Sequence, residues 1–215
     1  MSSSRSPQVP GSARVDSADC ALNRALRDAV QRAKRDQTQL PGAVRSADEL
    51  MASMRLNGFG AAHAINAFKM RGDLDGCLRA LSYLDRAGIA ATQYHYSLAI
   101  AASARNRVWL KAIDLLKEKE SKDIVPDTFT FSSAITACEK GGRWEEALGL
   151  LSEMASKGVE RDTITFNAAI SACGKGGQWE EALGLLREMA SEGVERDTVT
   201  YSAAISACGK GGRWA

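Results

Sequence analysis

Between residues 128 and 162, apolar side chains recur at intervals of three and four residues, which is the spacing of one face of an α-helix. The first stripe consists of Phe131, Ala134, Ile135 and Cys138. The second consists of Trp144, Ala147, Leu148, Leu151 and Met154. The pair Gly141-Gly142 lies between the two stripes and interrupts the first. The pattern therefore predicts two amphipathic helices joined by a short turn.

Residues at the ends of these stripes fit helix termini. Asp127 or Thr128 supplies a side-chain oxygen that caps the first helix. Glu145 and Glu146 stand in the first turn of the second helix, where the helix dipole favours negative charge. The sequence Gly158-Val159 then predicts a Schellman cap, in which a glycine ends the helix and the next apolar residue folds back.

The same pattern repeats along the chain with a period of 35 residues. The four tryptophans, Trp109, Trp144, Trp179 and Trp214, keep this interval. Residues 128–162 and 163–197 are identical at 27 of 35 positions, so the interval is a true duplication. One helical hairpin cannot bury its own apolar face, whereas stacked hairpins can. The chain is therefore predicted to be all-α, a right-handed α-solenoid of tandem 35-residue helix-turn-helix repeats.

Seven segments follow from this period. They are 1–17, a disordered or targeting segment; 18–57, a divergent helical hairpin; 58–92, a degenerate repeat; 93–127, 128–162 and 163–197, full repeats; and 198–215, a truncated repeat. The truncated repeat has no second helix, so an apolar stripe that includes Ile205 and Cys208 is expected to be uncovered. That stripe predicts self-association or fraying of 198–215.

Two segments of the repeat at 163–197 resemble the pentatricopeptide-repeat family. They are TITFNAAI at 163–170 in the first helix and GGQWEEAL at 176–183 before and within the second, with Glu188-Met189-Ala190, Gly193 and Asp197 completing the match. The resemblance implies that first helices line a concave surface on which two polar residues per repeat face one base of single-stranded RNA. The base-binding residues that it implies are Ser97 with Asp127, Ser132 with Asp162, Asn167 with Asp197, and Ser202.

The chemistry of these pairs agrees with that implication. An ionised carboxylate only accepts hydrogen bonds, and among the bases only G and U offer a ring N–H on the Watson–Crick edge. The resemblance assigns G to a serine partner and U to an asparagine partner, which gives 5′-GGU-3′ for the three complete pairs. A helix-start Asp is more often only a cap, and Ser or Asn on a helix is often only solvated. The alignment of three pairs favours base contact, and the two roles are compatible.

Two further columns accompany the pairs. Tyr94, Phe129, Ile164 and Val199 precede the Ser/Asn column by one helical turn. They stack on bases, as the resemblance implies, or pack between repeats. Arg105, Lys140, Lys175 and Lys210 close each first helix. They complement the helix dipole or bind phosphates, and their regular row favours phosphate. The tryptophans and the cysteines at 138, 173 and 208 are assigned to the core.

Composition narrows the function classes. The chain is 45% hydrophobic and 25% charged with a formal net charge of +2, so RNA affinity must come from local placement and not from bulk charge. His63 and His95 lie in neither a deaminase motif nor a zinc motif, no CxxC pair exists, and no phosphate-binding glycine loop is present. No enzyme activity, metal, cofactor or small-molecule substrate is expected, and no apolar run is long enough to span a membrane.

Three functions stay open from the sequence. The first is sequence-selective binding of single-stranded RNA, in organelle RNA processing or stability. The second is a protein-interaction scaffold that binds a peptide or partner helix in the same concave surface. The third is a repeat array without a selected ligand. Residues 1–15 carry serines and two arginines without an acid, which suits import into a mitochondrion or chloroplast, although Pro7 and Pro10 interrupt an import helix.

Overall fold

The computed structural model describes residues 58–211, in which all regular secondary structure is α-helical. The segments 1–17 and 18–57 and the last residues, 212–215, lie outside the described residues. The helices are α3 (Gly58–Arg71), α4 (Leu74–Arg86), α5 (Gln93–Arg105), α6 (Trp109–Ser121), α7 (Thr128–Gly141), α8 (Trp144–Ser156), α9 (Thr163–Lys175), α10 (Trp179–Ser191) and α11 (Thr198–Lys210). The predicted helical repeats are thus confirmed from α3 onward.

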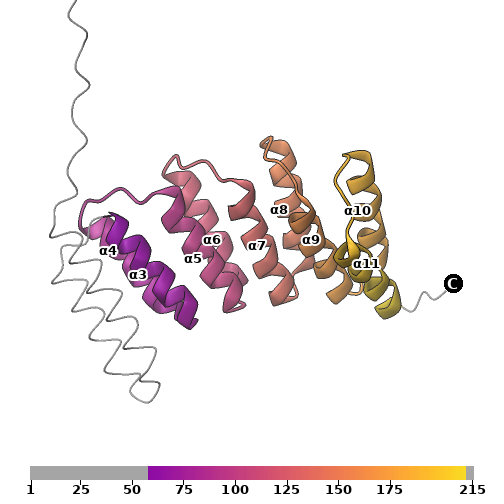
Figure 1. Cartoon of the computed structure of the whole chain (residues 1–215), viewed down its shortest axis with the longest axis horizontal. Coiled ribbons are helices and arrows are strands. Elements are labelled where there is room, and N and C mark those ends of the chain that lie inside the picture. The colour runs from indigo at the N-terminus through magenta and orange to yellow at the C-terminus, as the bar shows by residue number, and fades with distance from the viewer. Residues whose placement is uncertain (1–57, 212–215) are drawn as a thin grey trace, which may run out of the picture. The chain divides into compact units, whose positions relative to one another are not determined.

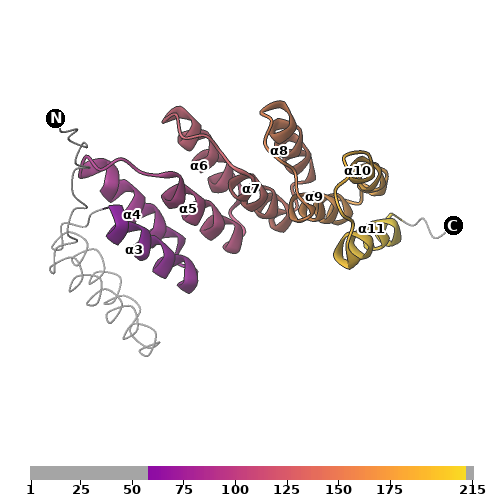
Figure 2. The ribbon, with the colours of Figure 1, turned by 45° about the horizontal axis from the view of Figure 1, so that its top comes forward.

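The helices pack as a row of hairpins. Each first helix contacts the first helix of the next repeat, so that α3, α5, α7, α9 and α11 form one layer. Each second helix packs between its own first helix and the next one, as α8 does between α7 and α9. Figures 1 and 2 show this alternation from two directions. This is the solenoid arrangement that the 35-residue period predicts.

Aspartates begin the first helices of the last three repeats. The carboxylates of Asp127, Asp162 and Asp197 accept a hydrogen bond from the backbone N–H three residues later, at 2.8–2.9 Å. Of the two caps that the sequence offered for α7, Asp127 is therefore the one used. This places each candidate base-binding aspartate at a fixed backbone position.

Left-handed residues end the helices. Gly158 has a φ of 65°, and the N–H of Val159 donates to the carbonyl of Met154 at 2.9 Å, which confirms the predicted Schellman cap. Repeat 93–127 differs, because Arg107 (φ 60°) and Asp123 (φ 58°) adopt the left-handed conformation at positions where the other repeats carry glycine. The counterpart of Arg107 in the next repeat is Gly142, with a φ of 71°.

Replacing Arg107 by Gly is expected to stabilise the protein by about 0.5–1 kcal/mol, because a side chain is disfavoured in the left-handed conformation. Arg105→Gly is the matched control. Arg105 is the last residue of right-handed α5, so the same loss of side chain there should destabilise by a similar amount. Urea denaturation of both variants measures the two effects. Destabilisation by Arg107→Gly would contradict the backbone argument.

The core lies between the two layers of helices and repeats its composition. Phe131, Ile135 and Cys138 of α7 are fully buried, as are Phe166, Ile170 and Cys173 of α9. The four cysteines in the described part of the chain are free thiols. Burial raises the pKa of Cys138 to about 12 and that of Cys173 to about 11, so both stay protonated at neutral pH. These two thiols are core residues, as predicted.

The three described tryptophans, Trp109, Trp144 and Trp179, lie between repeats and are only half-buried, whereas the sequence assigned them to the core. Trp144 of α8 lies against Gly176, at the end of the next first helix. A Cβ built on Gly176 would come within 2.3 Å of the indole Cδ1. Trp109 meets Gly141 and Trp179 meets Gly211 in the same manner. Trp144 and Trp179 therefore have like environments, as a regular stack requires.

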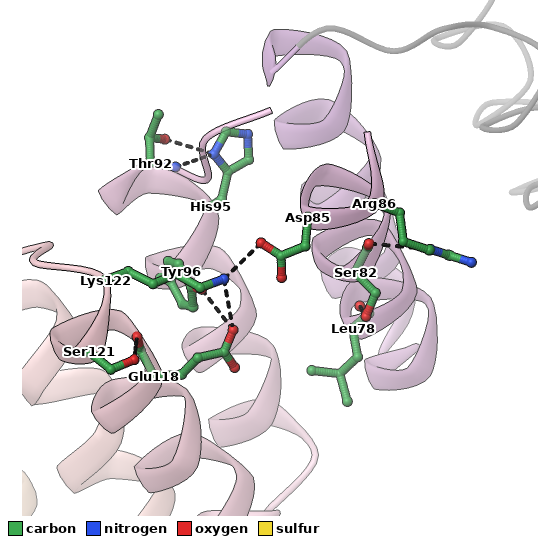
Figure 3. A network of polar contacts seen from close by, with 10 residues as sticks. All are labelled: Leu78, Ser82, Asp85, Arg86, Thr92, His95, Tyr96, Glu118, Ser121 and Lys122. Carbon is green, nitrogen blue, oxygen red and sulfur yellow. Dashed lines mark hydrogen bonds and ion pairs between the residues drawn. The ribbon is translucent and has the colours of Figure 1, made fainter. Parts of the chain in front are cut away.

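A polar network on the side of the second helices ties successive repeats together (Figure 3). The Lys122 ammonium, after α6, lies 2.8 Å from the Asp85 carboxylate of α4 and 3.3 Å from Glu118. The Tyr96 hydroxyl donates to Glu118 at 2.8 Å, and burial raises the pKa of Tyr96 to about 12. One repeat later, Lys157 makes the corresponding ion pair with Glu120. These ion pairs connect the second helix of each repeat to the end of the second helix of the next.

The last described helix, α11, has an uncovered apolar face. Tyr201 is 46% exposed and Ile205 67% exposed, although Phe166 and Ile170 at the same repeat positions are fully buried. The uncovered stripe is therefore confirmed at Ile205, while Cys208 is half-buried. Self-association through this face stays a prediction.

Candidate functional site

The candidate base-binding residues lie along one layer of helices, the first helices α5, α7, α9 and α11. A Ser or Asn in the second turn of one helix belongs with the aspartate that caps the next. The pair Asn167 and Asp197 is in direct contact, with the amide Nδ2 donating to a carboxylate oxygen at 3.2 Å. Neighbouring repeats thus bring residues 30 positions apart to hydrogen-bonding distance.

A threonine three residues after each aspartate holds the carboxylate in place. Thr165 donates both its backbone N–H (2.8 Å) and its hydroxyl (2.5 Å) to Oδ1 of Asp162. Thr200 makes the same two bonds to Asp197, at 2.8 and 2.9 Å. This buried threonine column was not among the predicted site residues, although the sequence contains it as Asp-x-x-Thr beginning at Asp127, Asp162 and Asp197. The bonds from Thr200 lower the pKa of Asp197, which keeps this carboxylate ionised.

At Asp162 and Asp197 the helix cap uses only one of the two carboxylate oxygens, Oδ1. Within the described residues, the hydrogen bonds to the carboxylates of Asp162 and Asp197 end on Oδ1, and the Val199 N–H makes a further, weaker interaction with the Asp197 carboxylate. Capping and a further hydrogen bond to a ligand are therefore compatible at both aspartates. A free carboxylate oxygen accepts from an N–H and repels another acceptor.

The Ser/Asn partners are not equally accessible. Ser132 and Asn167 are half-buried and Ser202 is exposed, while Ser97 is only 5% exposed. The Ser132 hydroxyl donates to the carbonyl of Phe129 at 3.1 Å and makes no direct bond to Asp162. The Asn167 Oδ1 is buried and accepts no hydrogen bond from the protein. The pair Ser132/Asp162 is therefore adjacent by register, whereas Asn167/Asp197 is directly bonded.

The pair Ser97/Asp127 has a different environment. Oδ1 of Asp127 accepts from the Thr130 backbone and hydroxyl, and Oδ2 accepts from the Gln93 amide. Burial alone would raise the pKa of Asp127, but the bonds from Thr130 and Gln93 outweigh it and hold the pKa below its ordinary value. Both oxygens of this carboxylate are thus hydrogen-bonded within the protein, an arrangement that the sequence did not predict.

A buried lysine lies beneath this pair. Lys119 of α6 has no exposed surface, and its ammonium donates to the Thr130 hydroxyl oxygen at 3.0 Å. Burial lowers the pKa of Lys119, although Asp127 and Glu120 act in the opposite direction. The corresponding core residues of the next two repeats are Met154 and Met189.

The column of large side chains before the Ser/Asn column is on the surface. The exposed fractions are 58% for Tyr94, 55% for Phe129, 67% for Ile164 and 60% for Val199. Such exposure does not fit the alternative in which these side chains pack between repeats. A regular row of exposed apolar groups one turn from the polar pairs provides surfaces on which flat rings can stack.

The cation column is also exposed, at the ends of the first helices. Arg105, Lys140 and Lys210 are exposed and Lys175 is 41% exposed at its side chain. Lys175 differs because its ammonium lies 2.5 Å from the Glu139 carboxylate, which also accepts from Ser171 at 3.0 Å. Glu139 therefore neutralises one member of the column, an ion pair that the sequence did not predict.

Within residues 58–211, no helix is long and apolar enough to cross a membrane. Over the same range, no group of three or more His, Cys, Asp or Glu side chains is placed to hold a metal ion.

The fold and the columns define a helical-repeat solenoid with one polar and one apolar row on its first helices. Comparison with protein families identifies the repeat. The family described as "PPR repeat family" matches residues 161–210, and that described as "PPR repeat" matches residues 129–159. The repeats at 129–159 and 161–210 therefore belong to the PPR (pentatricopeptide) repeat family. A comparison with curated proteins found no match.

Solved structures with this fold include RNA complexes. The pentatricopeptide repeat protein PPR10 in complex with an 18-nt psaJ RNA element is 25% identical, with a TM-score of 0.66 over 89% of this chain. PPR10 from maize, at 23% identity, has a TM-score of 0.59 over 91% of this chain. This chain spans only about a third of PPR10, 31% and 32% respectively.

A smaller relative matches over more of its own length. The PPR domain of Arabidopsis thaliana protein-only RNase P 1, in complex with tRNA, is 18% identical with a TM-score of 0.61. The match covers 69% of this chain and 78% of that domain. At this identity the likeness concerns the fold.

Proposed function

We propose that this protein binds single-stranded RNA selectively, with one base facing each complete Ser/Asn–Asp pair. The observation that carries the proposal is the split role of Asp162 and Asp197, in which Oδ1 caps a helix and Oδ2 is left for a ligand. Such an oxygen favours G and U, which offer a ring N–H. The RNA complex of PPR10, which shares the fold at 25% identity, supports the proposal.

The two other columns complete the proposed mode of binding. The exposed side chains from Tyr94 to Val199 stack against base faces, and stacking on an aromatic contributes about 1–3 kcal/mol per base. Arg105, Lys140 and Lys210 bind phosphates, while Lys175 is held by Glu139. The proposal places the protein in organelle RNA processing or stability, in a mitochondrion or chloroplast, and assigns no catalysis to residues 58–211.

A peptide scaffold is the second candidate, because the exposed apolar row would also suit an apolar peptide. The two candidates differ in their response to base identity. RNA reading needs unpaired base edges, so a single strand that contains GGU should bind more tightly than the same sequence in a blunt duplex. A peptide scaffold should distinguish neither between RNA sequences nor between single-stranded and duplex RNA.

The test is a binding titration of the full chain with both RNAs at several salt concentrations. The logarithm of the binding constant should fall with the logarithm of the salt concentration, with a slope of about −0.7 per phosphate contact, as expected for single strands. Glu139→Gln releases Lys175 and should steepen the slope by roughly one such contact. Equal affinity for strand and duplex, together with no dependence on salt, would rule out the proposal.

A further inference from the structure

We infer that Gln93 prevents the Ser97/Asp127 pair from selecting the base that faces it, so that sequence selection begins one repeat later, at Ser132/Asp162. The inference rests on the proposed RNA-binding function and names the residue that sets where selection starts. It makes Gln93 a specificity-determining residue through the state of a neighbouring carboxylate, without a contact of its own to a base.

Gln93 differs from the residues at the equivalent position of the next repeats. The residues that correspond to Gln93 in the next repeats are Thr128 and Thr163. Their hydroxyls donate to the carbonyls of Glu160 and Glu195, at 2.9 and 2.8 Å, and leave the nearby aspartate untouched. The longer Gln93 side chain reaches Oδ2 of Asp127 instead. The oxygen that stays open at Asp162 and Asp197 is thereby occupied at Asp127.

The Ser97 hydroxyl, the other polar group of the pair, is also hydrogen-bonded within the protein. The Ser97 hydroxyl donates to the carbonyl of Gln93 at 2.9 Å and lies 3.3 Å from the Thr130 hydroxyl oxygen. That oxygen also accepts from the buried Lys119 ammonium. Ser97 is 5% exposed, so its hydroxyl is turned into this network and away from solvent. The pair has neither an open acceptor nor an accessible partner hydroxyl.

Freeing the Asp127 carboxylate for a base costs free energy, because its hydrogen bond from Gln93 has to be broken. A base that binds Asp127 must first break the bond from Gln93 to an ionised carboxylate, and charge-assisted bonds of this type are stronger than neutral ones. The base would only replace one such bond by another, so little net preference for any base remains. Among the described residues, no bond to Oδ2 of Asp162 has to be broken, and at Asp197 only the weak interaction of the Val199 N–H competes with a base.

The experiment uses the full chain and RNAs in which one base of the GGU core varies at a time. Wild type should show less than about a twofold preference at the first base and a clear preference at the second and third. Gln93→Thr, which restores the residue of the other repeats, should create a preference for G over A and C at the first base of about fivefold or more. The double variant Q93T/K119M should do the same.

Thr128→Gln is the matched control, because it places the closing side chain beside Asp162. It should remove selection at the second base and leave the third unchanged, with helicity and melting temperature checking that the fold is intact. If wild type selects the first base as strongly as the second, the inference about Gln93 is wrong, while the proposed RNA-binding function still stands. The same holds if Gln93→Thr and the double variant both fail to gain selection. Wild type that selects at no position would overturn the proposed function, and this inference with it.

Discussion

Replacing Lys119 by Met is expected to raise the free energy of unfolding by about 1–4 kcal/mol, the range seen when buried ionic groups are replaced by apolar ones. Lys119 has no exposed surface and its ammonium makes one hydrogen bond, to Thr130. The free-energy cost of removing an ammonium group from water is larger than the stabilisation from one hydrogen bond to a neutral acceptor. Methionine fills this position in the next two repeats, so the surrounding core already fits that side chain.

The stabilisation by Lys119→Met should depend on pH in a defined direction. Burial lowers the pKa of Lys119 below the ordinary value of 10.5, so the buried charge opposes folding at neutral pH. As pH rises above the lowered pKa, the folded wild type loses this charge before the unfolded chain does. The advantage of Met should therefore be full at neutral pH, shrink between the lowered pKa and 10.5, and vanish above it.

Urea denaturation of wild type and Lys119→Met at neutral and alkaline pH measures this effect. Met154→Lys is the matched control, since it introduces a lysine at the same position of the next repeat. That variant should lose stability by a similar amount, with the reverse dependence on pH. If Lys119→Met is less stable than wild type at neutral pH, the ammonium contributes more through Thr130 and Asp127 than its burial costs.

Replacing Asp197 by Asn is expected to move the preferred third base from U toward C. Asn offers an N–H donor beside its acceptor oxygen, and the ring nitrogen of C accepts whereas that of U donates. One polar contact of this kind discriminates by about 1–3 kcal/mol, or roughly 5- to 150-fold in the ratio of affinities. Competition between RNAs that differ only at this base gives the ratio directly.

Stability separates the two roles of Asp197 in this test. Asn caps helices about as well as Asp, so Asp197→Asn should unfold at nearly the same urea concentration as wild type. Asn167→Ser is a second control, because it should move the same base toward G and leave the second base unchanged. An unchanged ratio of U to C in Asp197→Asn would mean that Asp197 serves only as a cap.

The sequence predicted the features that depend on period and local chemistry. The helix pairs, the Asp127 cap and the Gly158-Val159 cap follow from spacing and from residue types at helix ends. The threonine column was equally visible as Asp-x-x-Thr, but its role depends on a hydroxyl reaching the same oxygen as the backbone N–H.

The features that the sequence did not predict depend on side-chain reach between repeats. Gln93 and Lys119 stand out from the aligned repeats, yet only the packing shows that both act on one aspartate. The Lys175–Glu139 ion pair joins residues 36 positions apart in neighbouring helices. Trp109, Trp144 and Trp179 have the spacing of a core stripe but lie half-buried against glycines of the next repeat.

The contact between tryptophan and glycine makes the interfaces of the stack unequal in strength. Three successive interfaces contain it, from Trp109–Gly141 to Trp179–Gly211. At the interface before them, Leu74 and Asn106 hold the corresponding positions. A stack in which each repeat contacts only its neighbours unfolds as a one-dimensional cooperative system, and its weakest coupling decides where it separates. The hairpin α3–α4 should therefore exchange its amide hydrogens independently of the rest, while α5 to α10 open together as one cooperative unit.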